Sequence, residues 1–296
     1  MNICLENVDL KSDSGPNSFA NKLVKYLSKD GHIITDLDKA DTRLCFIQAN
    51  HKSTTVPLFQ RLDGIYFNTD QDYEQQNYNI QKTYNQAHGV IFQSEFNKRL
   101  TYEYFGPHEY TAVIHNGADI ELIDNILPLK HAKLDEYSNI WSCASSWRPH
   151  KRLSDNIRYF LEHSKEDECL VVAGDCDQKV KDDRIFYVGH ASQEQLISLY
   201  KASKYFIHLA WLDHCPNVVV DARASGCQVI CSSTGGTKEI AGPNAIVIEE
   251  KEWDYRPIKL YTPPAINFEK KINNLCDMSY NMGNVVEKYV NFMKNV

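Results

Sequence analysis

Residues Tyr205–Cys231, YFIHLAWLDHCPNVVVDARASGCQVIC, contain the clearest structural signal of the chain. The apolar run Tyr205–Leu209 has the length of a buried strand, and Gln228–Cys231 is a second run of this kind. Between them, Pro216–Ala224 has the length and apolar spacing of a helix. Two strands joined by a helix in this order form a parallel pair with a crossover connection. This segment therefore predicts an α/β protein.

The same alternation extends through the rest of the chain in both directions. It is typical of doubly wound parallel sheets with helices on both faces. A polar stretch at residues 127–138 has neither pattern and separates two such series. We therefore expect an N-terminal Rossmann-like domain (1–126), a C-terminal Rossmann-like domain (127–275) and a C-terminal helix (276–296) that packs back on the N-terminal domain. The other expected strands are 2–6, 44–47, 90–92, 112–114, 139–144, 170–173 and 185–188, and the other expected helices are 18–29, 95–104, 153–161 and 193–202.

The overall composition excludes several classes of protein. With 296 residues, of which 43% are hydrophobic and 24% charged, the chain is neither collagen-like nor disordered. Its formal charge is −7, and its basic residues occur in pairs or short clusters, which argues against nucleic acid as a partner. No window has the ~18 apolar residues of a membrane span, and the N-terminus does not resemble an export signal. We therefore expect no transmembrane segment and a cytoplasmic location.

The nine cysteines are spread singly along the chain. There is no Cys-x-x-Cys pair and no histidine at zinc-like spacing, so the pattern predicts no metal site and indicates a reducing compartment. Cys45 and Cys231 lie in apolar runs, where a buried thiol behaves as a small hydrophobic group.

The loop and helix start at residues 213–221 contain the first candidate site. Pro216 suits the first helical position, and the backbone amides of Asn217 and Val218 would lie unpaired at the positive end of the helix dipole, which favours a phosphate. Asp213 and Asp221 would flank such an anion, and carboxylates accept hydrogen bonds from sugar or ribose hydroxyls. From spacing alone, a simpler interpretation stays open, in which Asp213 only caps the segment and Asp221 is a solvated helix residue.

A basic cluster follows the expected strand 139–144. Arg148 and Lys151 lie at the carboxyl end of this strand, where doubly wound sheets form their ligand crevice. These two cations are therefore placed to face an anion. A solvated basic turn is the alternative, although cations at a helix start oppose the helix dipole.

Two glycine-containing turns are weaker candidates. Gly235 and Gly236 follow a buried strand and would allow a ligand to approach the backbone, but such pairs are also common in ordinary tight turns. Gly15 lies between the first strand and the first helix, where Ser18 would serve equally well as a helix N-cap.

Taken together and in order, these segments resemble the retaining nucleotide-sugar glycosyltransferases of glycosyltransferase family 4. Residues 113–119 (VIHNGAD) resemble the Asn-Gly-x-Asp segment of that family, and residues 233–239 (STGGTKE) resemble its Gly-Gly-x-x-Glu segment. Residues 213–226 resemble its paired-glutamate motif, with seven residues between the acids. The likeness covers nearly the whole chain and implies the GT-B fold, in which two Rossmann-like domains face each other across a cleft.

The resemblance also implies roles for individual residues. Asp213 would contact the transferred sugar near the reacting carbon, and Asp221 would hold the ribose hydroxyls. Lys151, with Arg148 as its arginine partner, would bind the diphosphate, and Gly15 would approach the phosphate from the other domain. The implied reaction moves a hexose from a GDP-mannose or UDP-hexose class donor to a hydroxyl of a glycan, lipid or protein-linked acceptor, with retention and with no metal or other cofactor.

Three departures from the family pattern occur around these motifs. Both acids are aspartates where the family has glutamates, Arg148 lies three rather than about five residues before Lys151, and Pro16 removes one amide from the glycine loop. These departures keep open a non-catalytic nucleotide-sugar-binding subunit. A nucleotide-sugar epimerase or phosphorylase is a second alternative, because such enzymes share the fold. A dinucleotide dehydrogenase is disfavoured because no Gly-x-Gly-x-x-Gly follows the first strand.

A fourth departure concerns the histidine that the family has in its first domain. Residues 58–64 (LFQRLDG), where we expect it, contain none. His51 and His115 are the nearest in sequence, and a structural role suits each of them better. We therefore expect Asp63 or Arg61 to line the cleft instead.

Overall fold

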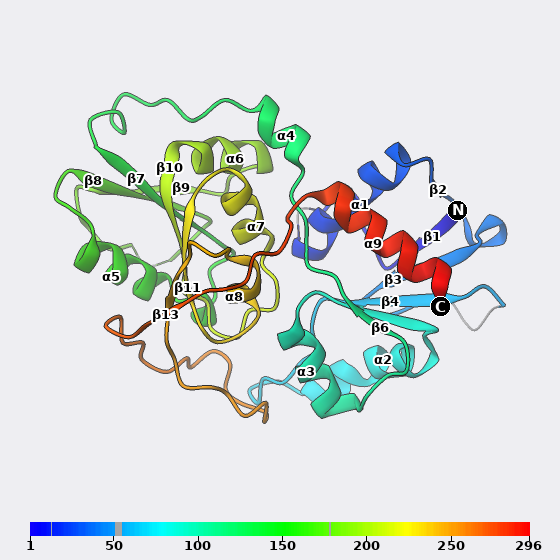
Figure 1. Cartoon of the computed structure of the whole chain (residues 1–296). Helices are drawn as coiled ribbons and strands as arrows, with labels where there is room; N and C mark the ends of the chain where they lie inside the picture. Colours follow the sequence, from blue (N-terminus) through cyan, green and yellow to red (C-terminus); the bar gives the residue numbers. More distant parts are fainter. Residues whose placement is uncertain (13, 51–54, 178) are drawn as a thin grey trace.

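A computed structural model describes residues 1–12, 14–50, 55–177 and 179–296. It contains two α/β domains, each built on a mainly parallel sheet (Figure 1). In the N-terminal domain the strand order is β2-β1-β3-β4-β5-β6, and every pairing among the described residues is parallel. Its elements are β1 (Asn2–Glu6), α1 (Gly15–Lys29), β2 (Ile33–Ile34), β3 (Thr42–Phe46), β4 (Leu58–Leu62), α2 (Tyr73–Gln86), β5 (Gly89–Phe92), α3 (Glu95–Phe105), β6 (Thr111–Val113) and α4 (Ile120–Asn125).

The C-terminal domain has the strand order β13-β12-β11-β10-β7-β8-β9, in which β13 pairs antiparallel with β12 and the other pairings are parallel. The order places β7 beside β10, so the chain reverses its winding direction between these two strands. Ligands of open α/β sheets bind at such a switch point, beyond the carboxyl ends of the strands. The elements are β7 (Asn139–Ala144), α5 (Leu153–His163), β8 (Glu168–Ala173), β9 (Ile185–Gly189), α6 (Gln193–Ala202), β10 (Ser203–His208), α7 (Asn217–Ala224), β11 (Gln228–Ser232), α8 (Thr237–Ile240), β12 (Ile246–Ile248) and β13 (Lys271–Asn273).

The segment with the clearest sequence signal forms the predicted unit. Strands β10 and β11 are parallel neighbours, with Tyr205 opposite Gln228, and α7 connects them. Pro216 is the N-cap of α7 and not its first helical residue, because its ψ of 122° is extended. The helix therefore begins at Asn217, one residue later than the sequence predicts.

The first helix also differs from its prediction. Helix α1 begins at Gly15, with Pro16 in its first turn and Ser14 as the N-cap residue. Ser18 lies inside the helix, where its amide donates to the carbonyl of Ser14 at 2.7 Å, so Ser18 is not the cap. Gly15 is consequently the first residue of a helix and not part of an extended glycine loop.

The cores explain why these segments fold together. Strands β3 and β4 are buried along their whole length, as expected for strands covered on both faces. Cys45 and Cys231 are fully buried in the two sheets.

None of the helices in the described ranges combines the length and apolarity needed to cross a membrane.

The last helix, α9 (Met282–Asn295), belongs to the N-terminal domain by its packing. Met282, Val286 and Tyr289 are buried in one core with Phe19 and the rest of the apolar face of α1. In Figure 1 this red helix lies along α1, and both chain termini are on the same domain. The helix starts at Met282, six residues after the expected start at 276, and the segment before it crosses over from the C-terminal domain.

Candidate active site

Asp213 lies in the loop that follows β10 and forms the centre of a charged cluster. Its Oδ2 atom accepts hydrogen bonds from Lys151 Nζ at 2.5 Å and from His208 Nε2 at 2.9 Å, and its Oδ1 atom accepts from the backbone amide of His214 at 3.0 Å. Burial by itself would raise the pKa of this carboxyl, but the charge of Lys151 and the contact with His208 outweigh burial and hold the pKa well below its usual range. Asp213 is therefore ionised at neutral pH.

The loop after β7 brings Lys151 to this carboxylate. Pro149–Lys151 form a single 3-10 turn, and Arg152 follows with a left-handed backbone (φ 54°). Arg152 is buried and its guanidinium donates two hydrogen bonds, of 2.9 and 2.8 Å, to Glu250, two residues beyond β12, so the turn is anchored to the segment that follows this strand. Arg148 is exposed, and the described part of the chain offers it no ion-pair partner. The structure thus joins Lys151 to Asp213 and leaves Arg148 at the surface.

The N-terminus of α7 meets the start of α1 from the other domain. The side chain of Asn217 donates a hydrogen bond of 2.8 Å to the carbonyl of Gly15. The amides of Asn217 and Val218 are among the first four of the helix, which lack intrahelical partners. Gly15 is exposed, with open space around its Cα. The N-terminal residues of α1 and α7, one helix from each domain, are therefore joined by a hydrogen bond.

Asp221 is paired with a residue that the sequence reasoning missed. Lys22 of α1 donates to Asp221 Oδ1 at 3.0 Å, and both side chains are at least nine-tenths buried. Burial raises the pKa of Asp221, although the charge of Lys22 acts in the opposite direction. The interpretation of Asp221 as a solvated residue is therefore wrong. A signal existed: Lys22 lies three residues after Phe19 and four before Tyr26, on the apolar face of its helix.

Glu239 also links the two domains. Its carboxylate accepts the backbone amides of Glu95 and Phe96 at 2.8 and 2.9 Å, so a residue of the C-terminal domain caps α3 of the N-terminal domain. His115 Nε2 lies 2.8 Å from the same carboxylate. His115 therefore has a structural contact, as expected, and Glu239 is a clamp between domains.

The two glycines of the same motif permit close packing. A Cβ on Gly236 would lie 2.0 Å from the carbonyl oxygen of His214 and 2.6 Å from Ser94 Oγ of the other domain. Gly235 has a φ of 84°, and a Cβ there would lie 2.6 Å from the carbonyl oxygen of Asp213. Both positions therefore require glycine for the packing of the protein itself.

Arg61 and Asp63 form a buried network at the end of β4. Arg61 is fully buried, is ion-paired with Asp63, and donates to Tyr289 of α9 at 3.0 Å and to Asn116 at 2.8 Å. The expectation that Arg61 lines a cleft is wrong, because the ring faces of Phe19 and its neighbours cover the guanidinium. Asp63 belongs to the same network. Burial raises the pKa of its carboxyl, although the charge of Arg61 acts to lower it. His51 lies outside the described residues.

His150, beside Lys151, makes the stability of this site dependent on pH. The ring is buried against Tyr261, and burial, followed by the charge of Lys151, lowers the pKa of His150 to about 3. His150 therefore stays neutral in the folded state, whereas in the unfolded chain it binds a proton with a pKa near 6.5. Stability should fall as the pH decreases, by about 2 kcal/mol between pH 7 and pH 5 for this residue. Urea unfolding at both pH values measures the difference.

Two variants test this assignment. His150→Gln should reduce the loss of unfolding free energy between pH 7 and pH 5 by about 2 kcal/mol, whereas His131→Gln, at an exposed histidine, should leave this loss unchanged. An undiminished slope in His150→Gln would show that another group is responsible.

Comparison with known proteins agrees with this architecture. Residues 134–255, within the C-terminal domain, match the family model described as Glycosyl transferases group 1. No curated protein matches the chain in sequence. Among solved structures, HepE of Anabaena in complex with UDP-glucose is 14% identical, with a TM-score of 0.68 and 100% of both chains covered.

Two further structures show the same similarity. Sucrose-phosphate synthase of Thermosynechococcus elongatus is 12% identical, with a TM-score of 0.65 over 84% of this chain and 86% of that one. AviGT4, a glycosyltransferase involved in avilamycin A biosynthesis, is 11% identical, with a TM-score of 0.64 over 99% of this chain and 97% of that one.

The chain thus has the GT-B fold, and the predicted fold class is confirmed. Its C-terminal domain, which contains Lys151, Asp213 and Asp221, is similar to the group 1 glycosyltransferases.

Proposed function

We propose that the protein is a retaining hexosyltransferase of the family 4 type that uses a nucleoside-diphosphate sugar. One observation carries the proposal: Lys151 is paired with the ionised Asp213 at the switch point of the domain that matches group 1 glycosyltransferases, in the loop that leads into α7. A cation and helix amides suit a diphosphate, and a carboxylate suits sugar hydroxyls.

Catalysis would come from groups that stabilise the leaving diphosphate. This group gains negative charge as the glycosidic bond breaks, so Lys151, Arg148 and the amides of Asn217 and Val218 bind the transition state more tightly than the ground state. These groups would supply the positive charge that other enzymes take from a metal ion. Lys151 would exchange part of its contact with Asp213 for a phosphate oxygen.

Asp213 would position the transferred sugar. It is held by Lys151 and His208, so its carboxylate is oriented and ionised. A carboxylate engaged in this way is a hydrogen-bond acceptor and a poor nucleophile. We therefore propose attack by the acceptor hydroxyl on the face that the diphosphate leaves, with the leaving phosphate accepting the hydroxyl proton. This route retains the anomeric configuration.

The ribose role of Asp221 requires a change at the domain boundary. In this structure Lys22 occupies the carboxylate, and the two residues belong to different domains. A ribose that binds Asp221 would displace Lys22, so we propose that the donor enters when the domains separate. Gly235 and Gly236 would then contact the donor only through their backbone.

The similar structures favour a UDP-hexose as the first donor to test. The HepE structures are described as complexes with UDP-glucose, and with UDP and glucose. Neither of these structures is described as a complex with GDP-mannose, the alternative donor. We therefore propose UDP-glucose or a related UDP-hexose as donor.

Calorimetric titration with UDP-glucose and GDP-mannose tests donor binding, and product analysis with a labelled donor tests the reaction. We expect micromolar to millimolar binding of a nucleotide sugar, and label transfer when an acceptor sugar is added. Epimerised label without acceptor would indicate an epimerase, and transfer to phosphate would indicate a phosphorylase. Binding with neither transfer nor slow hydrolysis would indicate a non-catalytic subunit. Failure of every nucleotide sugar to bind would contradict the proposal.

A further inference from the structure

A cavity of about 620 Å³ lies between the domains, beside the loop that contains Asp213. Lys151, Arg148 and Asp213 do not line it, and its walls come from α3, α8 and β13 and from the loops after β10, β11 and β12. Leu212, which lines the cavity, directly precedes Asp213, and Gly235, which also lines it, packs against the Asp213 backbone. A molecule in the cavity would therefore lie next to the proposed reaction site.

One wall of the cavity is aromatic. Tyr255 lies 5.2 Å from Trp253 and 5.8 Å from Phe96 between ring centroids, and the guanidinium of Arg99 lies 4.5 Å from the Tyr255 ring. Aromatic faces carry partial negative charge, which attracts the weakly positive C–H groups on the flat side of a sugar ring. Phe96 and Trp253 are buried, whereas Tyr255 is partly exposed, so the Tyr255 ring is the aromatic surface of this wall that a pyranose can reach.

The charged lining distinguishes between neutral and anionic ligands. Of the five carboxylates that line the cavity, Glu250 is neutralised by Arg152, and Glu239 is held by the amides of α3. The other charged side chains balance, because Glu95, Glu249 and Glu252 stand against Arg99, Lys238 and Lys251. The neutral amides that hold Glu239 do not cancel its charge, so the cavity has no net attraction for a dianion.

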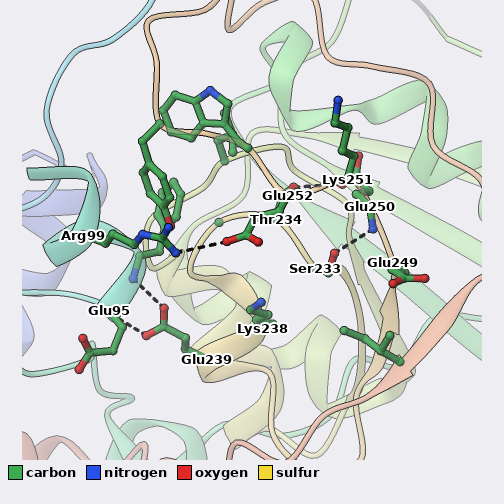
Figure 2. A pocket seen from close by; sticks show the side chains of 16 residues that line it. Glu95, Arg99, Ser233, Thr234, Lys238, Glu239, Glu249, Glu250, Lys251 and Glu252 are labelled. Atoms are coloured by element: carbon green, nitrogen blue, oxygen red, sulfur yellow. Dashed lines mark hydrogen bonds and ion pairs between the residues drawn. The ribbon is translucent and has the colours of Figure 1, made fainter. Parts of the chain in front are cut away.

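The arrangement of these groups suits many hydroxyls. In Figure 2, Glu95 and Arg99 come from α3 on one side, and Lys238 and Glu249 come from the C-terminal domain on the other. Carboxylates accept and cations donate hydrogen bonds, so hydroxyls on opposite edges of a ring would both find partners.

Two residues of the lining have strained backbones. Leu212 (φ 56°) and Tyr255 (φ 63°) are non-glycine residues in the left-handed region. Such conformations cost on the order of 1–3 kcal/mol and gather at ligand sites, where the surrounding structure maintains them. Both strained residues line the same cavity.

We propose that this cavity binds the acceptor, and that the acceptor presents a neutral, polyhydroxylated sugar there and not a phosphorylated group. The inference rests on the proposed glycosyl transfer. The two substrates then bind in surroundings of different charge: the diphosphate of the donor binds near Lys151, and the neutral hydroxyls of the acceptor bind near the aromatic wall. The volume lies within the ~300–1,000 Å³ of small-ligand sites and accommodates more than one sugar ring.

The test removes the aromatic ring without disturbing the backbone. Asparagine tolerates a left-handed conformation, so Tyr255→Asn deletes the ring, whereas Tyr255→Phe keeps it. Tyr78→Asn, at an exposed tyrosine of α2, is the matched control. The probes are the methyl glycosides of glucose, galactose, mannose and N-acetylglucosamine, together with glucose 6-phosphate, titrated into the full chain with UDP present and followed by saturation-transfer NMR. UDP and UDP-glucose are titrated separately by calorimetry.

We expect at least one neutral glycoside to bind, and glucose 6-phosphate to bind more weakly than methyl glucoside. Tyr255→Asn should weaken glycoside binding about fivefold, while Tyr255→Phe and Tyr78→Asn leave it unchanged and UDP-glucose binds all variants equally. The proposal is overturned if no glycoside binds, or if Tyr255→Asn binds the glycoside as tightly as the wild type does. It is also overturned if Tyr255→Asn loses binding of UDP-glucose but keeps binding of UDP, because this result would place the donor hexose in the cavity. Glycoside binding without any nucleotide-sugar binding would instead reject the proposed function and leave the sugar preference of the cavity standing.

Discussion

Lys151→Ala should lower kcat by about 10²–10³-fold while weakening donor affinity much less. The reason is that Lys151 would act on charge that develops only as the diphosphate leaves. In this structure the lysine already lies 2.5 Å from Asp213, at the switch point of the sheet, so it needs little rearrangement to reach a phosphate there. Steady-state kinetics, with donor affinity from calorimetry, separate the two effects.

The same substitution removes a counter-charge from Asp213, so folding must be checked alongside activity. Lys151→Arg keeps the charge and should recover part of kcat, and Lys204→Ala, at an exposed lysine of β10, should leave kcat and the melting temperature unchanged. A Lys151→Ala variant that is folded and turns over as fast as the wild type would refute the catalytic role.

Arg152→Met should lower the free energy of unfolding by about 3–5 kcal/mol. Arg152 and Glu250 are almost fully buried and joined by two hydrogen bonds, and Arg152 also donates to the carbonyl of Pro264 at 2.8 Å. Removal of the guanidinium leaves a buried carboxylate without its counter-charge. It also frees the turn that places Lys151, so kcat should fall as well. Urea unfolding measures the first effect.

Two further variants distinguish this mechanism from a general loss of packing. Arg152→Met/Glu250→Gln removes the uncompensated charge and should recover part of the lost stability, since Thr234 can still donate to the amide oxygen. Arg158→Met, at a half-exposed arginine of α5, should change stability by no more than about 1 kcal/mol. If the double variant were less stable than Arg152→Met, the charge argument would be wrong.

Much of the fold is predictable from local patterns. The β10–α7–β11 unit and most of the strands of both sheets lie where apolar runs and helical spacing predict them, because each pattern reflects one buried face. Strand β4 escapes this reasoning because Gln60 and Arg61 are buried within it. Arg61 is tolerated there because it is ion-paired with Asp63 and donates a hydrogen bond to Tyr289, which lies 228 residues further along the chain. No local pattern reports such a contact.

The candidate site shows the same division. Lys151 and Asp213 could be placed together from sequence because both follow parallel strands, whose carboxyl ends share one edge. By contrast, the Lys22–Asp221 pair joins residues that are 199 positions apart, and the contact of Glu239 with the Glu95 amide of α3 joins residues that are 144 positions apart. These contacts depend on how the two domains pack, and they determine which carboxylates are free. Domain packing is set by the whole of both surfaces and therefore cannot be derived from any single motif.

A crystal structure of the chain with UDP-glucose would test the central claim most directly. The account predicts that the diphosphate lies within hydrogen-bond distance of Lys151 Nζ and of the amide of Asn217 or Val218, with Lys22 separated from Asp221. A diphosphate bound elsewhere, with the Lys151–Asp213 and Lys22–Asp221 pairs intact, would contradict it.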